Sequence, residues 1–300
     1  MNNIDVIEVF MNGDKVGRVA LTPDLLCAFE YDPQYLLSGK SISPYFLPLK
    51  PELAVAKRDP FAGNFGVFDD SLPDGWGNAI LDRYLKEKGY NPAKLTILQR
   101  LALVGSTGRG ALEYKPDWSI KSDEEKVNFD RLAKEAEKIL TSDEYTGEGL
   151  DTLYRYAGSS GGARPEVFVK IDGKEWLVKF RASVDSLNIG ETEYNYSLLA
   201  KKCGINMPET RLFEGKYFGV ERFDRTPEGK IHTISAAGLL NADYRIPSLD
   251  YSGLLKVCHN LTRNMEEVYD LFRQMVFNIV IKNRDDHAKN FSFQLIGNEW

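Results

Sequence analysis

The stretch Ile281–Phe293, IKNRDDHAKNFSF, follows the apolar run MVFNIVI (275–281). The sequence therefore predicts a buried helix that ends in a dense group of charged, amide and imidazole side chains. Within this group, Asp285 and Asn290 are five residues apart. A carboxylate can accept the proton of a substrate hydroxyl, and an amide oxygen can hold Mg²⁺ without adding charge. The pair suits phosphoryl transfer, but an ordinary polar helix end has the same composition, and the spacing alone leaves both interpretations open.

The composition is that of a globular protein with a substantial core. The 300 residues are 43% hydrophobic and 27% charged, which favours two domains or one two-lobed body. A net charge of −6 argues against a broad nucleic-acid-binding surface and leaves DNA contact to a basic partner. The cysteines Cys27, Cys203 and Cys258 form no CxxC pair, so free thiols in a reducing compartment are expected. With no signal-peptide pattern and no long apolar window, we expect a cytoplasmic protein without membrane contact.

Three modules are predicted along the chain. The first, residues 1–118, contains a hairpin at Asn12-Gly13, a helix from Asp74 or Gly75 to Gly89, a helix over 94–104 and a glycine-rich connection into a strand (105–116). The second, 119–224, begins with a charged surface segment carrying one helix over 129–140 and continues with strands, a helix over 191–203 and a hairpin at Glu214-Gly215. The third, 225–300, is helical, and Val268 to Val280 would form a wide apolar face.

Three further features of the second module bear on chemistry. Lys179 lies in the apolar strand segment WLVKF (176–180), where a buried lysine needs a charge partner. Glu193 on the next helix is the predicted partner and Glu191 its near rival, although a strand lysine that faces water is the more common case. The loop GSSGGARPE (158–166) could present backbone N–H groups to phosphate, and VERFDR (220–225) lies where a strand gives way to the helical part.

The order of these features is more informative than any one of them. A glycine loop, a strand lysine, a helix glutamate, a strand-to-helix hinge and a D-x-x-x-x-N loop follow one another as they do in protein kinases. A metal-dependent phosphohydrolase would account for RDDH (284–287) alone and leaves the lysine and the hinge unexplained.

The motifs SSGGARP, LVKF, VERFDR and NRDDHAKNFSF resemble those of the HipA-type serine/threonine kinases, the toxins of bacterial toxin–antitoxin pairs. In the first module, VFDDSLPDGWG and GRGALEYKP resemble the N-terminal subdomain of that family. The resemblance spans nearly the whole chain. It implies an α+β, two-lobed, kinase-like fold with an extra N-terminal β-rich subdomain, an ATP-binding lobe over 119–224 and an incomplete helical catalytic lobe over 225–300.

The resemblance also implies ATP and Mg²⁺ as cofactors and assigns roles to residues. Asp285 would be the catalytic base, Asn290 a metal ligand, Lys179 a phosphate contact and Ser159 an autophosphorylation site that switches the kinase off. The partners implied are a HipB-like DNA-binding antitoxin, through which alone DNA is contacted, and a protein substrate for which glutamyl-tRNA synthetase is the precedent. The full set of implied nucleotide contacts is Gly161, Gly162, Ala163, Arg164, Pro165, Glu166, Lys179, Glu221, Arg222, Phe223, His287, Ala288, Lys289 and Asn290.

Two departures from the family pattern bear on activity. Glu166 stands where the family usually has lysine, and a carboxylate there would repel phosphate. The chain stops at Trp300, before the Tyr-Asp segment whose aspartate supplies the second Mg²⁺ ligand. These departures predict weak nucleotide binding, negligible turnover and self-association through an uncovered apolar face between Val268 and Ile281. The alternative function is therefore a catalytically inactive kinase-like module that binds nucleotide or an antitoxin.

Overall fold

The computed structural model describes residues 2–120, 127–142, 148–157 and 160–300. The first strands form a five-stranded antiparallel sheet in the order β4-β3-β2-β1-β5. Asn12 and Gly13 both have positive φ, 49° and 92°, as a tight two-residue turn requires, which confirms the predicted hairpin. The strands are β1 (Val6–Met11), β2 (Asp14–Leu21), β3 (Cys27–Tyr31), β4 (Ala54–Val55) and β5 (Leu112–Lys115).

The helices of this first module are α1 (Gly66–Asp69), α2 (Gly75–Glu87) and α3 (Ile97–Val104). The predicted start of α2 is confirmed, with Asp74 as the residue before the helix. Helix α3 starts later than the predicted residue 94, because Thr96 and Gln99 close a capping box there. A short 3₁₀ turn, Pro92–Lys94, precedes it.

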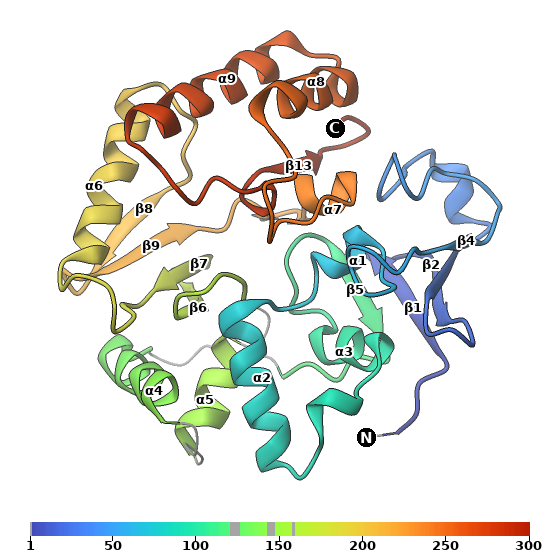
Figure 1. Cartoon of the computed structure of the whole chain (residues 1–300), viewed down its shortest axis with the longest axis horizontal. Helices are drawn as coiled ribbons and strands as arrows, with labels where there is room; N and C mark the ends of the chain where they lie inside the picture. Colours follow the sequence, from blue (N-terminus) through green and yellow to red (C-terminus); the bar gives the residue numbers. More distant parts are fainter. Residues whose placement is uncertain (1, 121–126, 143–147, 158–159) are drawn as a thin grey trace.

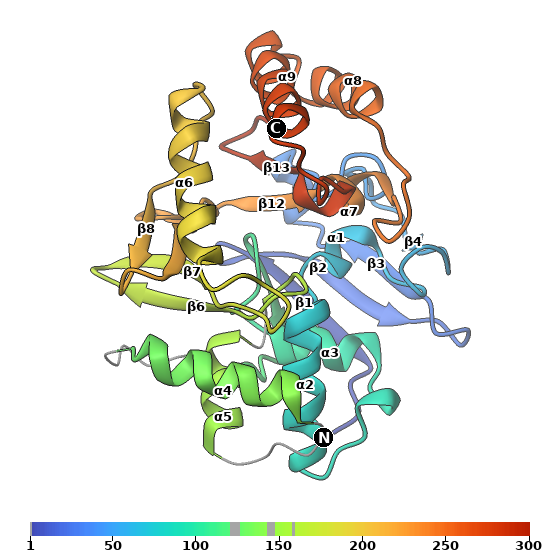
Figure 2. The ribbon, with the colours of Figure 1, turned by 60° about the vertical axis from the view of Figure 1, so that its left-hand side comes forward.

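The second sheet has the order β6-β7-β9-β8 and is antiparallel throughout. Its strands are β6 (Glu166–Ile171), β7 (Lys174–Lys179), β8 (Thr210–Phe213) and β9 (Tyr217–Glu221). One face packs on α4 (Phe129–Thr141) and α5 (Glu148–Ala157), and α6 (Ile189–Lys202) lies over the other (Figure 2). Alternate residues therefore meet different helices, and Lys179 faces α6. Helix α5 is an element that the sequence analysis missed in the charged segment.

The third predicted module, residues 225–300, packs against the N-terminal module. Its strands are β10 (Arg225–Thr226), β11 (Gly229–Lys230), β12 (His232–Ser235) and β13 (Ser292–Leu295), and its helices are α7 (Ala236–Leu240), α8 (Tyr251–Thr262) and α9 (Met265–Val280). Strand β13 pairs antiparallel with β12, and the N–H of Ala236 donates to the carbonyl of Phe291 at 2.8 Å. The stretch after α9 is thereby fixed against the start of α7.

Helix α9 is largely exposed, so the prediction of a buried helix is wrong. Leu271 is the buried residue of the helix, whereas the side chains of Phe272, Ile279 and Val280 are 48%, 61% and 72% exposed. The helix packs beside α8 along one edge (Figure 1). The periodicity gave the apolar face correctly, but periodicity does not reveal whether another element covers that face.

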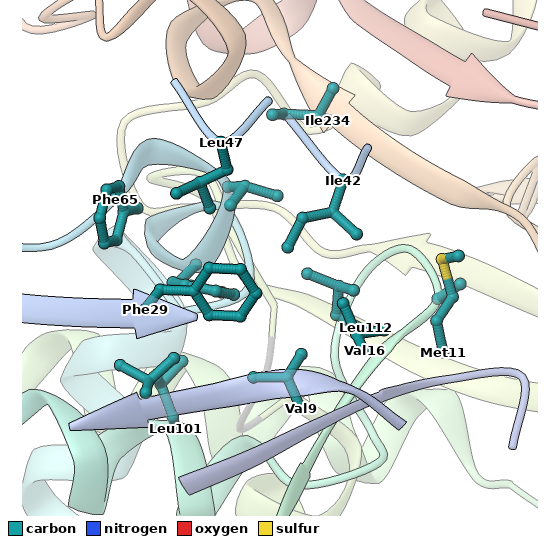
Figure 3. Close-up of a cluster of buried hydrophobic side chains, with 14 of the residues drawn as sticks. Val9, Met11, Val16, Phe29, Ile42, Leu47, Phe65, Leu101, Leu112 and Ile234 are labelled. Carbon is teal, nitrogen blue, oxygen red and sulfur yellow. The ribbon is translucent and has the colours of Figure 1, made fainter. Parts of the chain in front are cut away.

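Two hydrophobic cores hold the chain together, and each draws on more than one of the three predicted modules. The first core surrounds the five-stranded sheet and includes Ile234 of β12, whose side chain lies above Ile42 in Figure 3. The second core joins Trp76 and Ile80 of α2 to α4, α5 and Trp176 of β7. Helix α2, which belongs to the N-terminal module by sequence, therefore packs as part of the second body.

His232 lies fully buried between the N-terminal module and β12. Its Nε2–H donates to the carbonyl of Ile42 at 2.8 Å, and burial lowers the pKa of the ring from 6.5 to about 4. The folded state keeps the ring of His232 neutral. The burial of this neutral ring therefore contributes fully to the free energy of unfolding above pH 6.5, and the contribution is lost as the pH falls through about 4. The full difference amounts to about 3 kcal/mol.

We predict that the free energy of unfolding of the wild type falls between pH 7 and pH 4.5, and that His232→Leu removes this component of the fall. Denaturant titrations of both proteins at the two pH values measure it. The variant loses the hydrogen bond at every pH, so the comparison is between slopes and not between absolute stabilities. Equal slopes in the two proteins would contradict the assignment.

Candidate functional site

The described part of the glycine loop, Ser160–Pro165, presents successive backbone N–H groups to carboxylates. The N–H of Gly161 donates to Oε1 of Glu166 at 3.0 Å, and the N–H of Gly162 donates to Oδ1 of Asp74. Gly162 has φ +80°, a conformation that favours glycine. Successive backbone N–H groups that bind carboxylates can also bind other anions, and the role of this loop in phosphate binding stays a prediction. The predicted Ser159 lies outside the described residues.

Asp74 links this loop to the stretch after α9. Its Oδ2 lies 2.6 Å from Nζ of Lys289 and 3.8 Å from Nη2 of Arg109. These two cations lower the pKa of Asp74 against the opposing effect of burial, so the carboxylate is ionised. The sequence analysis predicted Asp74 only as a possible start of a helix and assigned no role to Arg109, although both lie in motifs it had noted, SLPDGWG and GRGALEYKP.

The strand lysine and the helix glutamate are paired. Nζ of Lys179 lies 3.2 Å from Oε2 of Glu193, with the two side chains 35% and 27% exposed. Glu191, the predicted rival, is exposed on the same helix. Lys179 also lies 5.8 Å from the ring centroid of Phe218. The ion pair holds the ammonium group at the inner end of β7, where it remains partly accessible to a ligand.

A cavity of about 340 Å³ adjoins this pair on the side of α4 and the start of α6. Its lining combines apolar side chains with charged ones, and more of the charged side chains are basic than acidic. The charged residues that line it are Asp130, Lys134, Glu137, Arg164, Lys179, Arg181, Glu193 and Lys216.

Arg164 of the glycine loop forms an ion pair with Asp185. Its guanidinium makes a two-pronged contact with Asp185, with Nε to Oδ2 at 2.9 Å and Nη2 to Oδ1 at 2.8 Å. The pKa of Arg164 is raised, first by this contact and further by the charges of Glu193 and Asp285. Of its neighbours, Ala163 is exposed and Pro165 is buried, with the carbonyl of Pro165 accepting from the N–H of Phe180 at 2.7 Å.

The D-x-x-x-x-N loop is closed by its own side chains. Nδ2 of Asn290 donates to the main-chain carbonyl of Asp285, and the N–H of Asp285 donates to Oδ1 of Asn283 at 3.1 Å. The carboxylate of Asp285 is 78% exposed, with Nε2 of His287 at 3.5 Å. This geometry leaves the Asp285 carboxylate accessible to a hydroxyl. It engages Asn290 through nitrogen, whereas a cation would bind through its oxygen.

The neighbouring Asp286 has a structural contact. Its Oδ2 accepts a hydrogen bond from the hydroxyl of Tyr251 at 3.0 Å, and that hydroxyl accepts from Nδ2 of Asn278 at 3.0 Å. This chain of hydrogen bonds joins the loop to the start of α8 and to α9. One oxygen of Asp286 is therefore committed to holding the loop in place.

Lys289 lies inside the molecule, with its side chain 7% exposed. Its ammonium group contacts Asp74 and lies 4.7 Å from the ring centroid of Tyr244, while Ala288 beside it is buried. The predicted contact of Lys289 with nucleotide stays a prediction. In this structure its charge is matched by Asp74, so it acts on the glycine loop through that carboxylate.

The hinge residues are mostly engaged within the protein. The carboxylate of Glu221 lies 2.8 Å from Nζ of Lys174, and the N–H of Arg222 donates to the carbonyl of Glu175 at 2.8 Å. Phe223 is 53% exposed, and its carbonyl accepts from Nε2 of Gln294 at 3.1 Å. Glu221, Arg222 and Phe223 are among the predicted nucleotide contacts, and of these the side chain of Phe223 is the one that is open to a ligand.

Beyond the hinge, buried charges fasten this segment to the glycine-rich connection of the N-terminal module. Asp224 Oδ2 accepts from Nη2 of Arg222 at 2.8 Å and from the N–H of Gly110 at 2.7 Å. Nη2 of Arg225 donates to the carbonyl of Gly108 at 2.8 Å. The two arginines overcome the effect of burial and lower the pKa of Asp224 to about 2. The cluster is ionised and fixes the hinge, a role that the motif VERFDR did not reveal.

Metal binding by this site depends on few protein ligands. Across residues 2–120, 127–142, 148–157 and 160–300, no three His, Cys, Asp or Glu side chains form a group that could hold a metal ion. Asp285 and Asn290 fit Mg²⁺ chemically, because both offer oxygen. A Mg²⁺ ion held there would take most of its six ligands from phosphate oxygens and water.

Comparison with known proteins gives a consistent picture. A model described as the HipA N-terminal domain matches residues 7–115, and one described as the HipA-like C-terminal domain matches residues 158–300. "Putative kinase Y4dM" of Sinorhizobium fredii (strain NBRC 101917 / NGR234) is 22% identical over 317 aligned positions, which cover 97% of this chain and 73% of that protein.

A solved structure also resembles this chain. It is a chain of the Shewanella oneidensis MR-1 complex of the toxin–antitoxin system HipA, HipB and its operator DNA. The TM-score is 0.69 at 19% identity, and the match covers 98% of this chain and 73% of that one. The likeness confirms the predicted α+β, two-lobed fold. Among the described residues, no helix is long and apolar enough to cross a membrane, and the cytoplasmic location stays a prediction.

Lys179→Met should weaken the affinity for ATP with Mg²⁺ by about tenfold or more, the scale of one charge-assisted contact. A calorimetric titration measures the change. The matched control is Lys174→Met, which removes a lysine from the other end of the same strand, where it pairs with Glu209 and Glu221 on the surface. Affinity unchanged in Lys179→Met, or weakened equally in both variants, would reject the role.

Glu166 should make nucleotide binding pH-dependent. Burial raises the pKa of its carboxyl from 4.5 to about 7, against the lowering effect of Lys179 and Arg109. Below pH 7 the group is increasingly neutral, so its repulsion of phosphate fades and affinity for ATP rises. Above pH 7 it is ionised and affinity falls.

Glu166→Gln removes this titration and keeps the size of the side chain. Affinities measured from pH 6 to pH 8 in both proteins isolate the effect, because the protonation of ATP itself is common to both. The difference in affinity between variant and wild type should be small at pH 6 and large at pH 8. A difference that is constant across this range would contradict the assigned pKa.

Proposed function

Because the chain belongs to the HipA family, we propose that it is a protein kinase that transfers the γ-phosphate of ATP to a serine or threonine of a protein. The observation that supports this most is the bridge made by Asp74. It brings the glycine loop, through Gly162, and the Asp285–Asn290 loop, through Lys289, to opposite oxygens of one carboxylate. The glycine loop, which would bind phosphate, and the segment that carries the candidate base are thereby linked through one carboxylate, an arrangement that supports in-line phosphoryl transfer.

Each residue has a role in this reaction. The loop N–H groups and Lys179 would bind and orient the phosphates, and Phe223 would lie against the adenine. The substrate hydroxyl oxygen would bond to the γ-phosphorus while the bond to the leaving oxygen of ADP breaks. Its proton passes to the exposed carboxylate of Asp285. Bound Mg²⁺, with Asn290 as one ligand, would neutralise charge on the phosphates.

The partners follow from the family as part of the same proposal. We propose a HipB-like antitoxin as the regulatory partner, since the similar solved complex contains HipB and operator DNA. The net charge of −6 favours DNA contact through such a partner and not through this chain. An aminoacyl-tRNA synthetase, with glutamyl-tRNA synthetase as the precedent in the family, is the proposed class of protein substrate.

A second candidate function is a module that binds nucleotide or an antitoxin without transferring phosphate. Two observations favour it. The N–H groups of Gly161 and Gly162 already donate to carboxylates, and Asp286 is engaged by Tyr251. With Asn290 as a neutral ligand, Mg²⁺ would be held loosely, and a misplacement of about 1 Å can cost about a hundredfold in rate.

A transfer assay with γ-labelled ATP, Mg²⁺ and a family substrate separates the two candidates. Asp285→Asn should reduce any transfer by at least about a hundredfold, because it removes the base and leaves the size of the side chain unchanged. Nucleotide affinity and the unfolding midpoint serve as controls and should stay near the wild-type values. Transfer by Asp285→Asn at the wild-type rate would exclude Asp285 as the base, while binding without transfer by the wild type would establish the second candidate.

A further inference from the structure

Helix α2 begins at an aspartate that does not cap it. An aspartate in this position usually accepts a hydrogen bond from the second or third N–H of its own helix. Asp74 makes no such bond. Its carboxylate is turned outward, with Oδ1 to the N–H of Gly162 and Oδ2 to Nζ of Lys289 at 2.6 Å. Helix α2 therefore has no side-chain cap, and the Asp74 carboxylate binds the glycine loop and the segment around Lys289 instead.

The backbone at the start of α2 lies directly against the glycine loop. The N–H of Trp76 donates to the carbonyl of Gly162 at 2.8 Å, and its indole Nε1–H donates to the carbonyl of Glu166 at 3.1 Å. A Cβ atom added to Gly75 would lie 2.1 Å from the Gly162 carbonyl oxygen, and one added to Gly77 would lie 2.2 Å from that of Ser160. The DGWG sequence therefore permits an approach that larger residues would block.

Both main-chain polar groups of Gly162 are therefore hydrogen-bonded to the start of α2. Its N–H donates to Asp74, and its carbonyl accepts from the N–H of Trp76. The next two N–H groups of the loop, those of Ala163 and Arg164, donate to no other group in the part of the chain that the structure describes. Both residues are exposed. The held loop thus presents two unengaged donors to an incoming phosphate.

We propose that Asp74 is a positioning residue for phosphoryl transfer. It holds the phosphate loop and the Asp285–Asn290 loop in a fixed relation, so the N-terminal module sets the geometry of the nucleotide site. The proposal rests on the proposed kinase function for its effect on turnover. Its effect on the loop itself is independent of any nucleotide.

The first test therefore uses the ligand-free protein. Amide hydrogen exchange is followed in the segment 160–166 in wild type, Asp74→Asn and Asp74→Ala. Asp74→Ala removes both contacts, and exchange should rise by about tenfold or more, the scale of a charge-assisted hydrogen bond. Asp74→Asn keeps an acceptor oxygen for the N–H of Gly162, so its rise should be intermediate. Exchange equal to that of the wild type in both variants would overturn the proposal.

The second test measures binding and turnover of ATP with Mg²⁺. Both variants should weaken ATP affinity by about tenfold and lower kcat, since the donors of Ala163 and Arg164 are no longer held in place. Lys289→Met should have a similar effect, and the double variant should be no worse than either single one, because both remove the same bridge. Additive effects, or tighter ATP binding after loss of the Asp74 carboxylate, would overturn the proposal.

Two matched controls exclude a general loss of stability. Asp151→Asn removes a carboxylate that pairs with Lys88 at the far end of α2 at 3.0 Å. Gly89→Ala strains a glycine of φ +79° that has nothing within 4 Å of an added Cβ, whereas Gly75→Ala drives a Cβ into the loop. Gly75→Ala should reproduce the exchange phenotype and the controls should not. If the wild type binds no nucleotide while exchange responds as expected, the proposed function fails and the positioning contact stands.

Discussion

The contact between the carboxylate of Asp74 and the segments around Gly162 and Lys289 is the constraint on which the site depends. These residues lie 88 and 215 positions from Asp74 along the chain (162 − 74 and 289 − 74), yet they meet within hydrogen-bonding distance. Such a contact exists only if α2 packs against the second sheet and β13 returns to β12, because these two arrangements place the loops. The candidate site is therefore built from all three predicted modules and not from the 119–224 segment alone.

The local elements could be read from the sequence because their causes are local. Asn12-Gly13 specifies its hairpin through positive φ, and strand alternation with one turn of helix places Lys179 opposite Glu193. The spacing of Asp285 and Asn290 was recognised in the sequence, whereas the hydrogen bond from Nδ2 of Asn290 to the carbonyl of Asp285 was not predicted.

The features that the sequence did not reveal depend on contacts between residues that lie far apart in the chain. Leu271 and Ile279 belong to the same apolar pattern on α9, but one is buried and the other is 61% exposed, because α8 covers only one edge. Helix α5 was missed because it is short and directly follows a charged stretch of the chain. Arg109 and Asp74 look like ordinary loop and cap residues until the fold brings them to the glycine loop.

Two carboxylates beside the same loop have pKa values shifted in opposite directions, and this difference has a structural cause. Asp74 touches Lys289 directly, so its pKa is lowered in spite of burial. Burial raises the pKa of Glu166 more than the charges of Lys179 and Arg109 lower it, so the pKa rises to about 7. The ionised group makes the fixed contacts that join the loops, and the group that can become neutral lies at the base of the loop. A bound phosphate would favour the neutral form of Glu166, so the affinity of the loop for an anion would depend on pH.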